Sequence, residues 1–165
     1  MTADNINTCE LHIDFLTGKL GYRSKHLANE LLAKAVGFKK NQKLTVIDAT
    51  AGLGRDGFIL ACLGCEVTML ERSPVVAKAL QDALTRALVN DELAQKLKLT
   101  LINIDANSYL QTLTPDQFPD VIYLDPMHPV RTKSALVKKE MRLLREIVGA
   151  DGDAAALLLA ALNCA

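Results

Sequence analysis

Residues 48–57 of the chain read Asp-Ala-Thr-Ala-Gly-Leu-Gly-Arg-Asp-Gly, and this stretch decides the fold. A short apolar run at residues 44–48 leads into it, and a helical pattern at residues 55–63 follows it and stops at Gly64. A second apolar run covers residues 66–70. The pattern predicts a strand, a glycine-rich turn, a helix and a second strand.

The same alternation continues along the chain. Pro74 opens a helical pattern that extends to about residue 88, and Ser73 before it is a suitable N-cap. Two more strands are predicted, over residues 98–104 and 120–124. Strands joined by helical crossovers form a parallel sheet with helices on both faces, so the predicted fold is α/β and Rossmann-like.

The two ends of the chain carry different patterns. Residues 1–43 form a basic N-terminal segment in which residues 27–36 predict an amphipathic helix, while residues 11–20 fit a strand or a loop. Residues 44–165 form the core of what we expect to be a single domain. The apolar, helix-like tail at residues 154–165 has no strand after it, and we expect the last strands of the sheet to be missing from this chain.

Composition narrows the class of protein. The chain has 165 residues, half of them hydrophobic, and no low-complexity block, which excludes disordered and fibrous proteins. No basic start followed by an apolar run opens the sequence, and no apolar stretch approaches the roughly 20 residues that cross a bilayer. We expect a cytoplasmic protein with no membrane span, whose four cysteines are reduced thiols.

The net charge of zero conceals two basic islands. Residues 19–43 contain seven Lys or Arg against Glu30 alone, and residues 131–146 contain six against two acids. The second island coincides with a predicted helix, residues 134–148, that has one apolar and one basic face. Such islands are either solvated surfaces or contacts for a polyanion.

The glycines of the first turn indicate a cofactor loop. Gly52, Gly54 and Gly57 spell Gly-x-Gly-x-x-Gly between a strand and a helix, the dinucleotide-binding pattern. However, Asp48 ends the strand beside the ligand position, where it would repel a pyrophosphate. S-adenosylmethionine (SAM) has no phosphate and carries a cationic sulfonium and amino group. The turn therefore favours SAM, and the alternatives are an NAD-dependent oxidoreductase or a tight turn without a ligand.

A second acid ends the second predicted strand. Glu71 lies 23 residues after Asp48, near the spacing at which an acid binds the ribose hydroxyls of a nucleotide. The alternative is an ordinary charge at the end of a strand, paired with Arg72.

The turn after the fourth predicted strand is stiff and rich in acceptors. It reads Asp125-Pro126-Met127-His128-Pro129, and proline offers a carbonyl but no N–H. An exocyclic amine of a nucleobase can attack a methyl carbon when acceptors hold its hydrogens and turn its lone pair out of the ring plane. The Asp125 carboxylate and the Pro126 carbonyl suit this role. His128 would stack on the base, unless it is a solvated loop residue.

Cys62 and Cys65 form a Cys-x-x-Cys pattern, but we expect neither redox chemistry nor a metal site. The pair is at the C-terminal end of a predicted helix, where the dipole does not favour a thiolate, and the chain has no second ligand pair at a spacing suited to zinc. Core packing is the preferred interpretation. With no Trp and seven Phe or Tyr, no aromatic platform for single-stranded RNA is expected.

Several strings resemble known families. Residues 125–129 resemble the Asp/Asn-Pro-Pro-aromatic motif of class I amino-methyltransferases. Residues 49–56, 67–72, 123–127 and 133–141 look like the bacterial ribosomal small-subunit methyltransferase J family, with a resemblance that runs from about residue 13 to residue 149. Members of that family make N2-methylguanosine in small-subunit ribosomal RNA.

The resemblance implies a SAM-dependent rRNA (guanine-N2) methyltransferase that releases S-adenosylhomocysteine and acts on small-subunit rRNA or the 30S particle. Its catalytic residues would be Asp125, Pro126 and His128. The cofactor contacts expected from the resemblance and from the turn itself are Asp48, Gly52, Gly54, Arg55, Asp56, Glu71, Arg72, Asn107, Ser108 and Asp125. Phosphates of the RNA would be held by Lys133, Lys138, Lys139, Arg142 and Arg145.

Two further functions stay open beside the oxidoreductase. One is a non-catalytic RNA-binding module, and the other is a SAM-dependent methyltransferase whose acceptor is a protein or a small molecule. If RNA is the acceptor, the target base must leave its stack to reach Asp125. The sequence does not indicate an oligomeric state.

Overall fold

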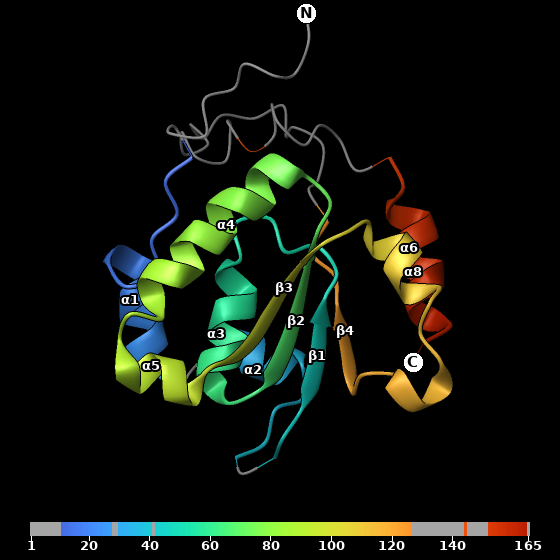
Figure 1. The fold of residues 1–165 in the computed structure, drawn as a ribbon. Coiled ribbons are helices and arrows are strands. Elements are labelled where there is room, and N and C mark those ends of the chain that lie inside the picture. The colour runs from blue at the N-terminus through green and yellow to red at the C-terminus, as the bar shows by residue number, and fades with distance from the viewer. Residues whose placement is uncertain (1–10, 28–29, 41, 127–143, 145–151, 165) are drawn as a thin grey trace, which may run out of the picture.

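The computed structural model describes residues 11–27, 30–40, 42–126, 144 and 152–164. Four parallel strands form one sheet in the order β3-β2-β1-β4 (Figure 1). They are β1 (Thr45–Asp48), β2 (Glu66–Glu71), β3 (Lys98–Asn103) and β4 (Val121–Tyr123). Each agrees with a predicted strand to within one residue at either end, and the parallel α/β class is confirmed.

The helices connect and flank the strands. Those of the N-terminal half are α1 (Gly18–Lys25), α2 (Leu31–Ala35), α3 (Arg55–Leu63) and α4 (Pro74–Ala87). Those that follow are α5 (Asp91–Lys96), α6 (Ala106–Leu110), the 3-10 turn η4 (Pro115–Gln117) and α8 (Ala154–Leu162). Among the helices that the structure describes, α4 is the longest at 14 residues, and none could span a bilayer.

The helix predictions hold best in the middle of the chain. The helix predicted over residues 55–63 is α3, and α4 begins at Pro74 with Oγ of Ser73 accepting a hydrogen bond from the backbone N–H of Val76 at 3.4 Å. The apolar tail forms α8. The helix predicted over residues 134–148 lies outside the described residues, apart from the buried Leu144.

Other helix predictions need correction. The helix expected over residues 27–36 is shorter, because only Leu31–Ala35 is α-helical among its described residues. The stretch left between strand and loop enters α1 at Gly18. Two short helices, α5 and α6, were not predicted; the side chains of Asn90 and Asp105 cap them.

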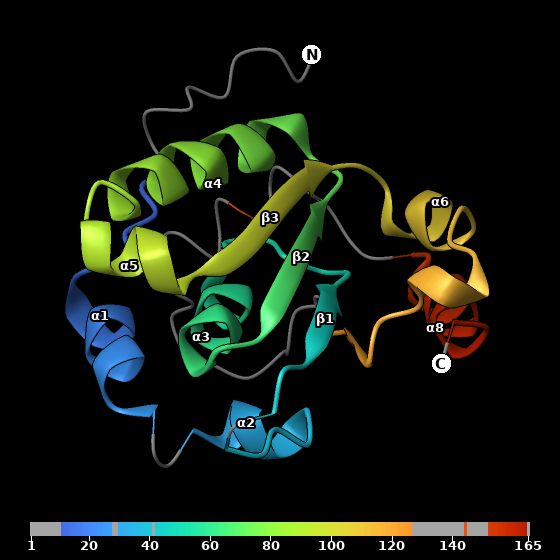
Figure 2. The ribbon, with the colours of Figure 1, turned by 60° about the horizontal axis from the view of Figure 1, so that its bottom comes forward.

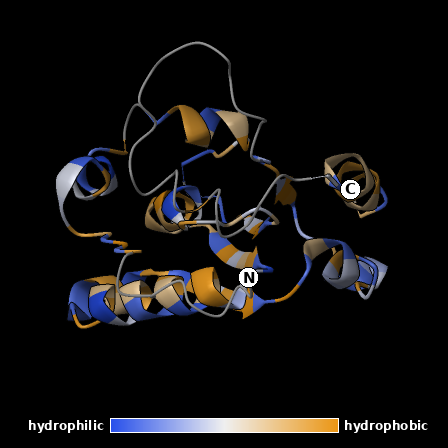
Figure 3. Cartoon of the chain, turned by 90° about the horizontal axis from the view of Figure 1, so that it is seen from above, coloured by the Kyte–Doolittle hydropathy of each residue, from blue (hydrophilic) through white to orange (hydrophobic). Residues whose placement is uncertain are grey.

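Alternating side chains divide the core between the two faces of the sheet. Val46 and Met69 belong to a cluster formed with α3 and α4, whereas Ile47 and Leu70 belong to a second cluster formed with α6 and α8. Figures 1 and 2 show the two pairs of helices on opposite sides of the sheet. Figure 3 shows polar and apolar residues alternating along α4, as expected for a helix with one face on the core.

The N-terminal segment packs on the α3 side of the sheet. The ring of Phe15 stacks on that of Phe58 in α3, with centroids 4.4 Å apart and planes 13° from parallel. Leu20 of α1 and Leu32 of α2 are buried in the same cluster. α1 and α2 are therefore held to the α3 side of the sheet by shared apolar packing.

Candidate active site

A cleft opens where the four strands end. This is the edge at which parallel α/β sheets bind ligands, and the strand order changes direction here because β1 pairs with β2 on one side and with β4 on the other. The wall is made by the turns after the strands and by the start of α8. Its residues are Ala49, Thr50, Gly52, Leu70, Glu71, Arg72, Ile104, Asp105, Ala106, Asn107, Asp125, Pro126, Leu144, Asp153, Ala154 and Leu157.

The structure brings six of the predicted site residues to this wall. They come from the ends of β1, β2 and β4 and from α6, so four separate segments converge on one cleft. The six are Gly52, Glu71, Arg72, Asn107, Asp125 and Pro126.

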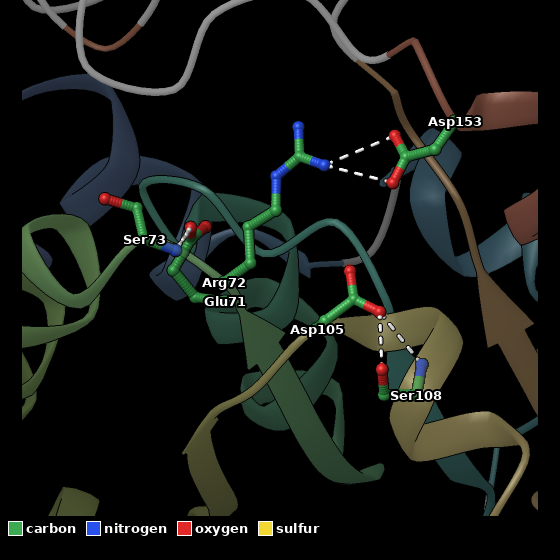
Figure 4. Close-up of polar contacts among 6 residues, drawn as sticks. All are labelled: Glu71, Arg72, Ser73, Asp105, Ser108 and Asp153. Atoms are coloured by element: carbon green, nitrogen blue, oxygen red, sulfur yellow. Dashed lines mark hydrogen bonds and ion pairs between the residues drawn. The ribbon is translucent and has the colours of Figure 1, made fainter.

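Glu71 is the most constrained of these side chains. It is only 5% exposed, and its carboxylate accepts a hydrogen bond from the backbone N–H of Ser73 at 2.7 Å (Figure 4). It also accepts one from the backbone N–H of Gly52 at 3.0 Å. The carboxylate thus joins the end of β2 to the glycine-rich turn. A carboxylate oxygen can accept more than one hydrogen bond, so ribose hydroxyls are suitable donors to a carboxylate at this position.

Thr50 joins the glycine-rich turn to Asp125, the first residue of the turn predicted at residues 125–129, which we call the acceptor turn. Sequence reasoning missed this role. Its Oγ1 accepts a hydrogen bond from the backbone N–H of Asp125 at 2.8 Å, and its own N–H donates to Oδ1 of Asp48 at 3.2 Å. The link depends on the pairing of β1 with β4, in which Asp48 lies beside Tyr123. Thr50 therefore sets the position of Asp125 relative to the glycine-rich turn.

Two glycines let α3 start directly behind the turn. Gly54 is the residue before the helix and has a φ of +67°, a left-handed conformation that a side chain would strain. A Cβ at Gly57 would lie 2.6 Å from Sδ of Met69 and 3.1 Å from Oδ2 of Asp48. Gly57 thus serves close packing of helix on strand, the function of the third glycine in such loops.

Asp48 does not line the cleft wall and is 2% exposed. It shares the α3 face of the sheet with Val46, so its side chain lies beneath the turn instead of facing a ligand above it. Burial raises the pKa of Asp48 to about 7, and the nearby charge of Asp56 adds to the effect. In this structure Asp48 supports the turn from behind.

Arg55 and Asp56 also lie away from the cleft wall. Asp56 accepts a hydrogen bond from the hydroxyl of Tyr123 at 3.0 Å, and its other carboxylate oxygen is 3.7 Å from Nη1 of Arg23 in α1. Burial, followed by the charge of Asp56, raises the pKa of Tyr123 well above its usual value, so the phenol stays a donor. Arg55 lines a separate groove beside α1.

Ser108 serves the start of α6 and does not line the cleft. Both its backbone N–H and its hydroxyl donate to Oδ1 of Asp105, at 2.9 and 3.0 Å (Figure 4). Arg72 also has an acidic partner, because its Nη1 contacts Oδ2 and Oδ1 of Asp153 at 3.1 and 3.2 Å (Figure 4). This ion pair connects the end of β2 to the start of α8.

The charges on the described cleft wall indicate whether SAM or NAD fits better. The wall contains four carboxylates, Glu71, Asp105, Asp125 and Asp153, and one guanidinium, that of Arg72. An excess of acids opposes a doubly charged pyrophosphate and favours a cationic ligand. The apolar wall residues Leu70, Ile104 and Leu157 offer a surface for a flat purine ring. The wall suits SAM better than NAD.

The Cys-x-x-Cys pair belongs to the core, as expected. Cys65 is fully buried, Cys62 packs against the same cluster, and both are free thiols. Burial raises the pKa of Cys62 to about 11 and also raises that of Cys65, which keeps both thiols protonated at neutral pH. Among the described residues, no group of His, Cys, Asp and Glu is arranged to hold a metal.

The remaining predicted site residues lie outside the described part of the chain. They are His128 of the acceptor turn and the proposed phosphate contacts Lys133, Lys138, Lys139, Arg142 and Arg145.

Comparison with known proteins gives consistent matches. A family model described as "Putative SAM-dependent methyltransferase" matches residues 1–165. A protein named ribosomal RNA small subunit methyltransferase J from Thioalkalivibrio sulfidiphilus is 54% identical over 158 residues, which cover 94% of this chain and 62% of that protein. A protein of the same name from Nitrosococcus oceani is 51% identical with the same coverage. The chain thus spans about three fifths of the length of these relatives.

A solved structure is also similar. The crystal structure of a SAM-dependent methyltransferase from Neisseria gonorrhoeae matches with a TM-score of 0.64 and 34% sequence identity, over 90% of this chain and 56% of that one.

Proposed function

The chain belongs to the SAM-dependent methyltransferase family whose model spans its residues 1–165, and on that basis we propose that it transfers a methyl group from SAM to the exocyclic N2 amine of a guanosine in small-subunit rRNA. The rRNA acceptor is supported by the relatives named ribosomal RNA small subunit methyltransferase J. An exocyclic amine as the acceptor is supported by the resemblance of residues 125–129 to the motif of class I amino-methyltransferases, and the guanine N2 position by the resemblance to the ribosomal small-subunit methyltransferase J family. We place the reaction in the cytoplasm, with naked rRNA or the 30S particle as substrate.

The observation that carries the proposal is the convergence of Glu71 and Asp125 on one acid-rich cleft. In the proposed complex, Glu71 accepts hydrogen bonds from the ribose hydroxyls, and Asn107 lies beside the adenine together with Leu70 and Ile104. Gly52 allows the turn to approach the methionine part of the cofactor. Bound SAM supplies an electrophilic methyl carbon on a sulfonium, which leaves as the neutral thioether S-adenosylhomocysteine.

The acceptor turn then prepares the nucleophile. The Asp125 carboxylate and the Pro126 carbonyl accept the two hydrogens of the amine, so that its lone pair turns toward the methyl carbon. As the N–C bond forms, the nitrogen becomes cationic and releases one proton to the Asp125 carboxylate. Thr50 fixes the backbone of Asp125 during this step through its 2.8 Å hydrogen bond. His128 is proposed to stack on the extruded base.

Methyl transfer from radiolabelled SAM to unmethylated small subunits and to naked rRNA tests the proposal, with nucleoside analysis of the product. We expect N2-methylguanosine with the unaltered chain, and no product with Asp125→Ala. Glu71→Gln should weaken SAM binding at least tenfold in isothermal titration, about 1.4 kcal/mol. Asp82→Asn, which removes a carboxylate on the exposed side of α4, serves as the matched control and should change neither.

Three results would contradict the proposal. One is binding of NADH with no heat from SAM, and another is full transfer by Asp125→Ala. The third is labelling of protein or small molecules but not of RNA, which would keep the cofactor and change the acceptor.

A further inference from the structure

The outer face of α1 carries side chains that the core does not use. Lys19, Tyr22, Lys25 and His26 are all exposed, and Tyr22 is 63% exposed. Positions 19, 22 and 26 recur at helical spacing, so these side chains share one face, while Leu20 and Gly21 are buried on the other. The exposed face combines positive charge with an aromatic ring.

This face is held rigidly on the molecule. Phe15, just before the helix, stacks on Phe58, and Leu20 is buried in the core. Arg23 makes two hydrogen bonds to the carboxylate of Glu30, at 2.8 and 2.9 Å, and its third nitrogen is 3.7 Å from Asp56. These contacts and the apolar packing fix the position of α1. Glu30 and Asp56 are bound by Arg23 and, in the part of the chain that the structure describes, do not pair with Lys19 or Lys25.

The exposed aromatic ring does not stand alone. The rings of Tyr22 and His26 are stacked, with centroids 3.9 Å apart and planes 16° from parallel. Nδ1 of His26 donates to the backbone carbonyl of Tyr22 at 2.8 Å, which fixes the imidazole. A fixed, solvent-exposed aromatic pair offers a flat surface on which a nucleobase can stack. The expectation of no aromatic platform counted Trp, Phe and Tyr alone, and Tyr22 and His26 become neighbours only when residues 18–25 form a helix.

The stretch of sequence that contains α1 is strongly basic. Residues 19–43 contain seven Lys or Arg and one acid, Glu30, which is already paired with Arg23. Within the described chain, the six lysines of this stretch have no recorded ion pair: Lys19, Lys25, Lys34, Lys39, Lys40 and Lys43. Lys19 and Lys25 on α1 itself thus offer positive charges suited to a polyanion.

A groove lies between α1 and the glycine-rich turn. Lys19 and Arg23 of α1 line it together with Leu53 and Arg55, which belong to the glycine-rich turn and the start of α3. Asp14 is the acid in the groove, and its carboxylate accepts hydrogen bonds from the Thr17 hydroxyl and the backbone of Leu16. A nucleic-acid strand that follows the groove from α1 would reach Leu53 of the glycine-rich turn. The neighbouring residue of that turn, Gly52, lines the cleft.

We infer that the outer face of α1 binds a single-stranded segment of the substrate RNA, with Lys19 and Lys25 contacting phosphates and Tyr22 stacking on a base. The inference rests on the proposed RNA acceptor and adds a contact surface separate from the basic island at residues 131–146. The stacked pair supplies the base contact, and the lysines supply the salt-dependent part of the affinity.

Fluorescence anisotropy with a labelled single-stranded RNA, measured without SAM at several salt concentrations, tests the inference. Lys19→Ala with Lys25→Ala should raise Kd about tenfold and lower the slope of log Kd against log salt by about 1 to 1.5, as expected for two lost phosphate contacts. The matched control is Lys78→Ala with Lys98→Ala, which removes the same charge from exposed sites on α4 and β3 and should leave Kd within twofold.

A second pair of variants isolates the base contact. Tyr22→Ala should raise Kd severalfold with an unchanged salt slope, whereas Tyr22→Phe should bind like the unaltered chain because the ring is kept. Isothermal titration with SAM confirms that every variant keeps its folded cleft.

The outcomes separate the inference from the proposed function. If the α1 variants bind RNA as the Lys78 and Lys98 control does, the inference is overturned while methyl transfer can still proceed. If the α1 variants lose RNA binding and the unaltered chain transfers no methyl group, the inference holds and the proposed activity is overturned. If the unaltered chain binds no RNA, both are overturned.

Discussion

The hydroxyl of Tyr123 donates a hydrogen bond of 3.0 Å to Oδ2 of Asp56, and this contact joins the last residue of β4 to the first turn of α3. Tyr123 lies two residues before Asp125, and Asp56 lies two residues after Gly54. Because Asp56 also pairs with Arg23, the contact extends from the acceptor turn through α3 to α1. We propose that the phenol positions the two turns of the candidate active site relative to each other.

Tyr123→Phe should therefore loosen the acceptor turn. Losing a half-buried hydrogen bond to a carboxylate should lower the free energy of unfolding by about 1 to 2 kcal/mol. We expect kcat for methyl transfer to fall while the affinity for SAM is unchanged, as measured by urea unfolding, single-turnover kinetics and titration. Tyr109→Phe is the control, because its hydroxyl makes no recorded hydrogen bond within the described chain. Equal losses in both variants would show that the Asp56 contact has no special role.

Thr50→Val should separate the position of Asp125 from overall stability. The substitution keeps the branched shape but removes the acceptor of the Asp125 N–H. Since Asp125 is exposed, water can replace the lost partner, and stability should change by less than about 1 kcal/mol. We expect kcat to fall about tenfold, equivalent to about 1.4 kcal/mol, with KM for SAM unchanged. Thr50→Ser should restore activity, and failure of this rescue would contradict the role given to Oγ1.

Asp48→Asn should change how stability depends on pH. Burial raises the pKa of Asp48 from 3.8 to about 7, so between these values the folded chain holds a proton that the unfolded chain has lost. The unaltered chain therefore loses stability as pH rises from about 4 to 7, whereas Asn does not titrate. Urea unfolding should show the variant gaining roughly 2 to 4 kcal/mol relative to the unaltered chain between pH 4 and pH 8. Parallel pH profiles for the two proteins would rule this out.

Gly57→Ala should destabilise the fold despite a better helix propensity. The added Cβ would lie 2.6 Å from Sδ and 2.8 Å from Cγ of Met69, which is fully buried. Overpacking of this kind costs about 1 to 3 kcal/mol, which exceeds the roughly 1 kcal/mol that alanine contributes to a helix. Gly152→Ala, where no atom lies within 4 Å of the new Cβ, should stay within about 0.5 kcal/mol in the same thermal unfolding measurement. An unchanged Tm for Gly57→Ala would contradict close packing at this position.

The parts of the fold that the sequence predicts well are those with strong local signals. Apolar runs bounded by acids and glycines place the strands, and the Ser73-Pro74 start and Gly64 end place two helices. The helices α5 and α6 are too short to show apolar periodicity, although Asn90 and Asp105 are recognisable caps.

The candidate site is predictable in outline but not in its contacts. That the turns after β1, β2 and β4 meet follows from the parallel sheet, and six of the predicted residues do line one cleft. The burial of Asp48 could have been inferred from strand alternation, since it shares a face with Val46. The contacts of Thr50 with Asp125 and of Tyr123 with Asp56 join residues 75 and 67 positions apart, so they depend on strand pairing that local patterns do not contain.

The two sides of the candidate active site lie on parts of the sheet that differ in how firmly they are anchored. Glu71 ends a strand of six residues paired on both sides, whereas Asp125 follows β4, which has three residues and, within the described chain, pairs only with β1. Fraying at a short sheet margin requires the least loss of buried contacts. Amide hydrogen exchange should therefore be faster at Ile122 than at Met69. As denaturant is added, the part of the cleft at Glu71, proposed to bind the methyl donor, should stay folded after the part at Asp125, proposed to bind the methyl recipient, has unfolded.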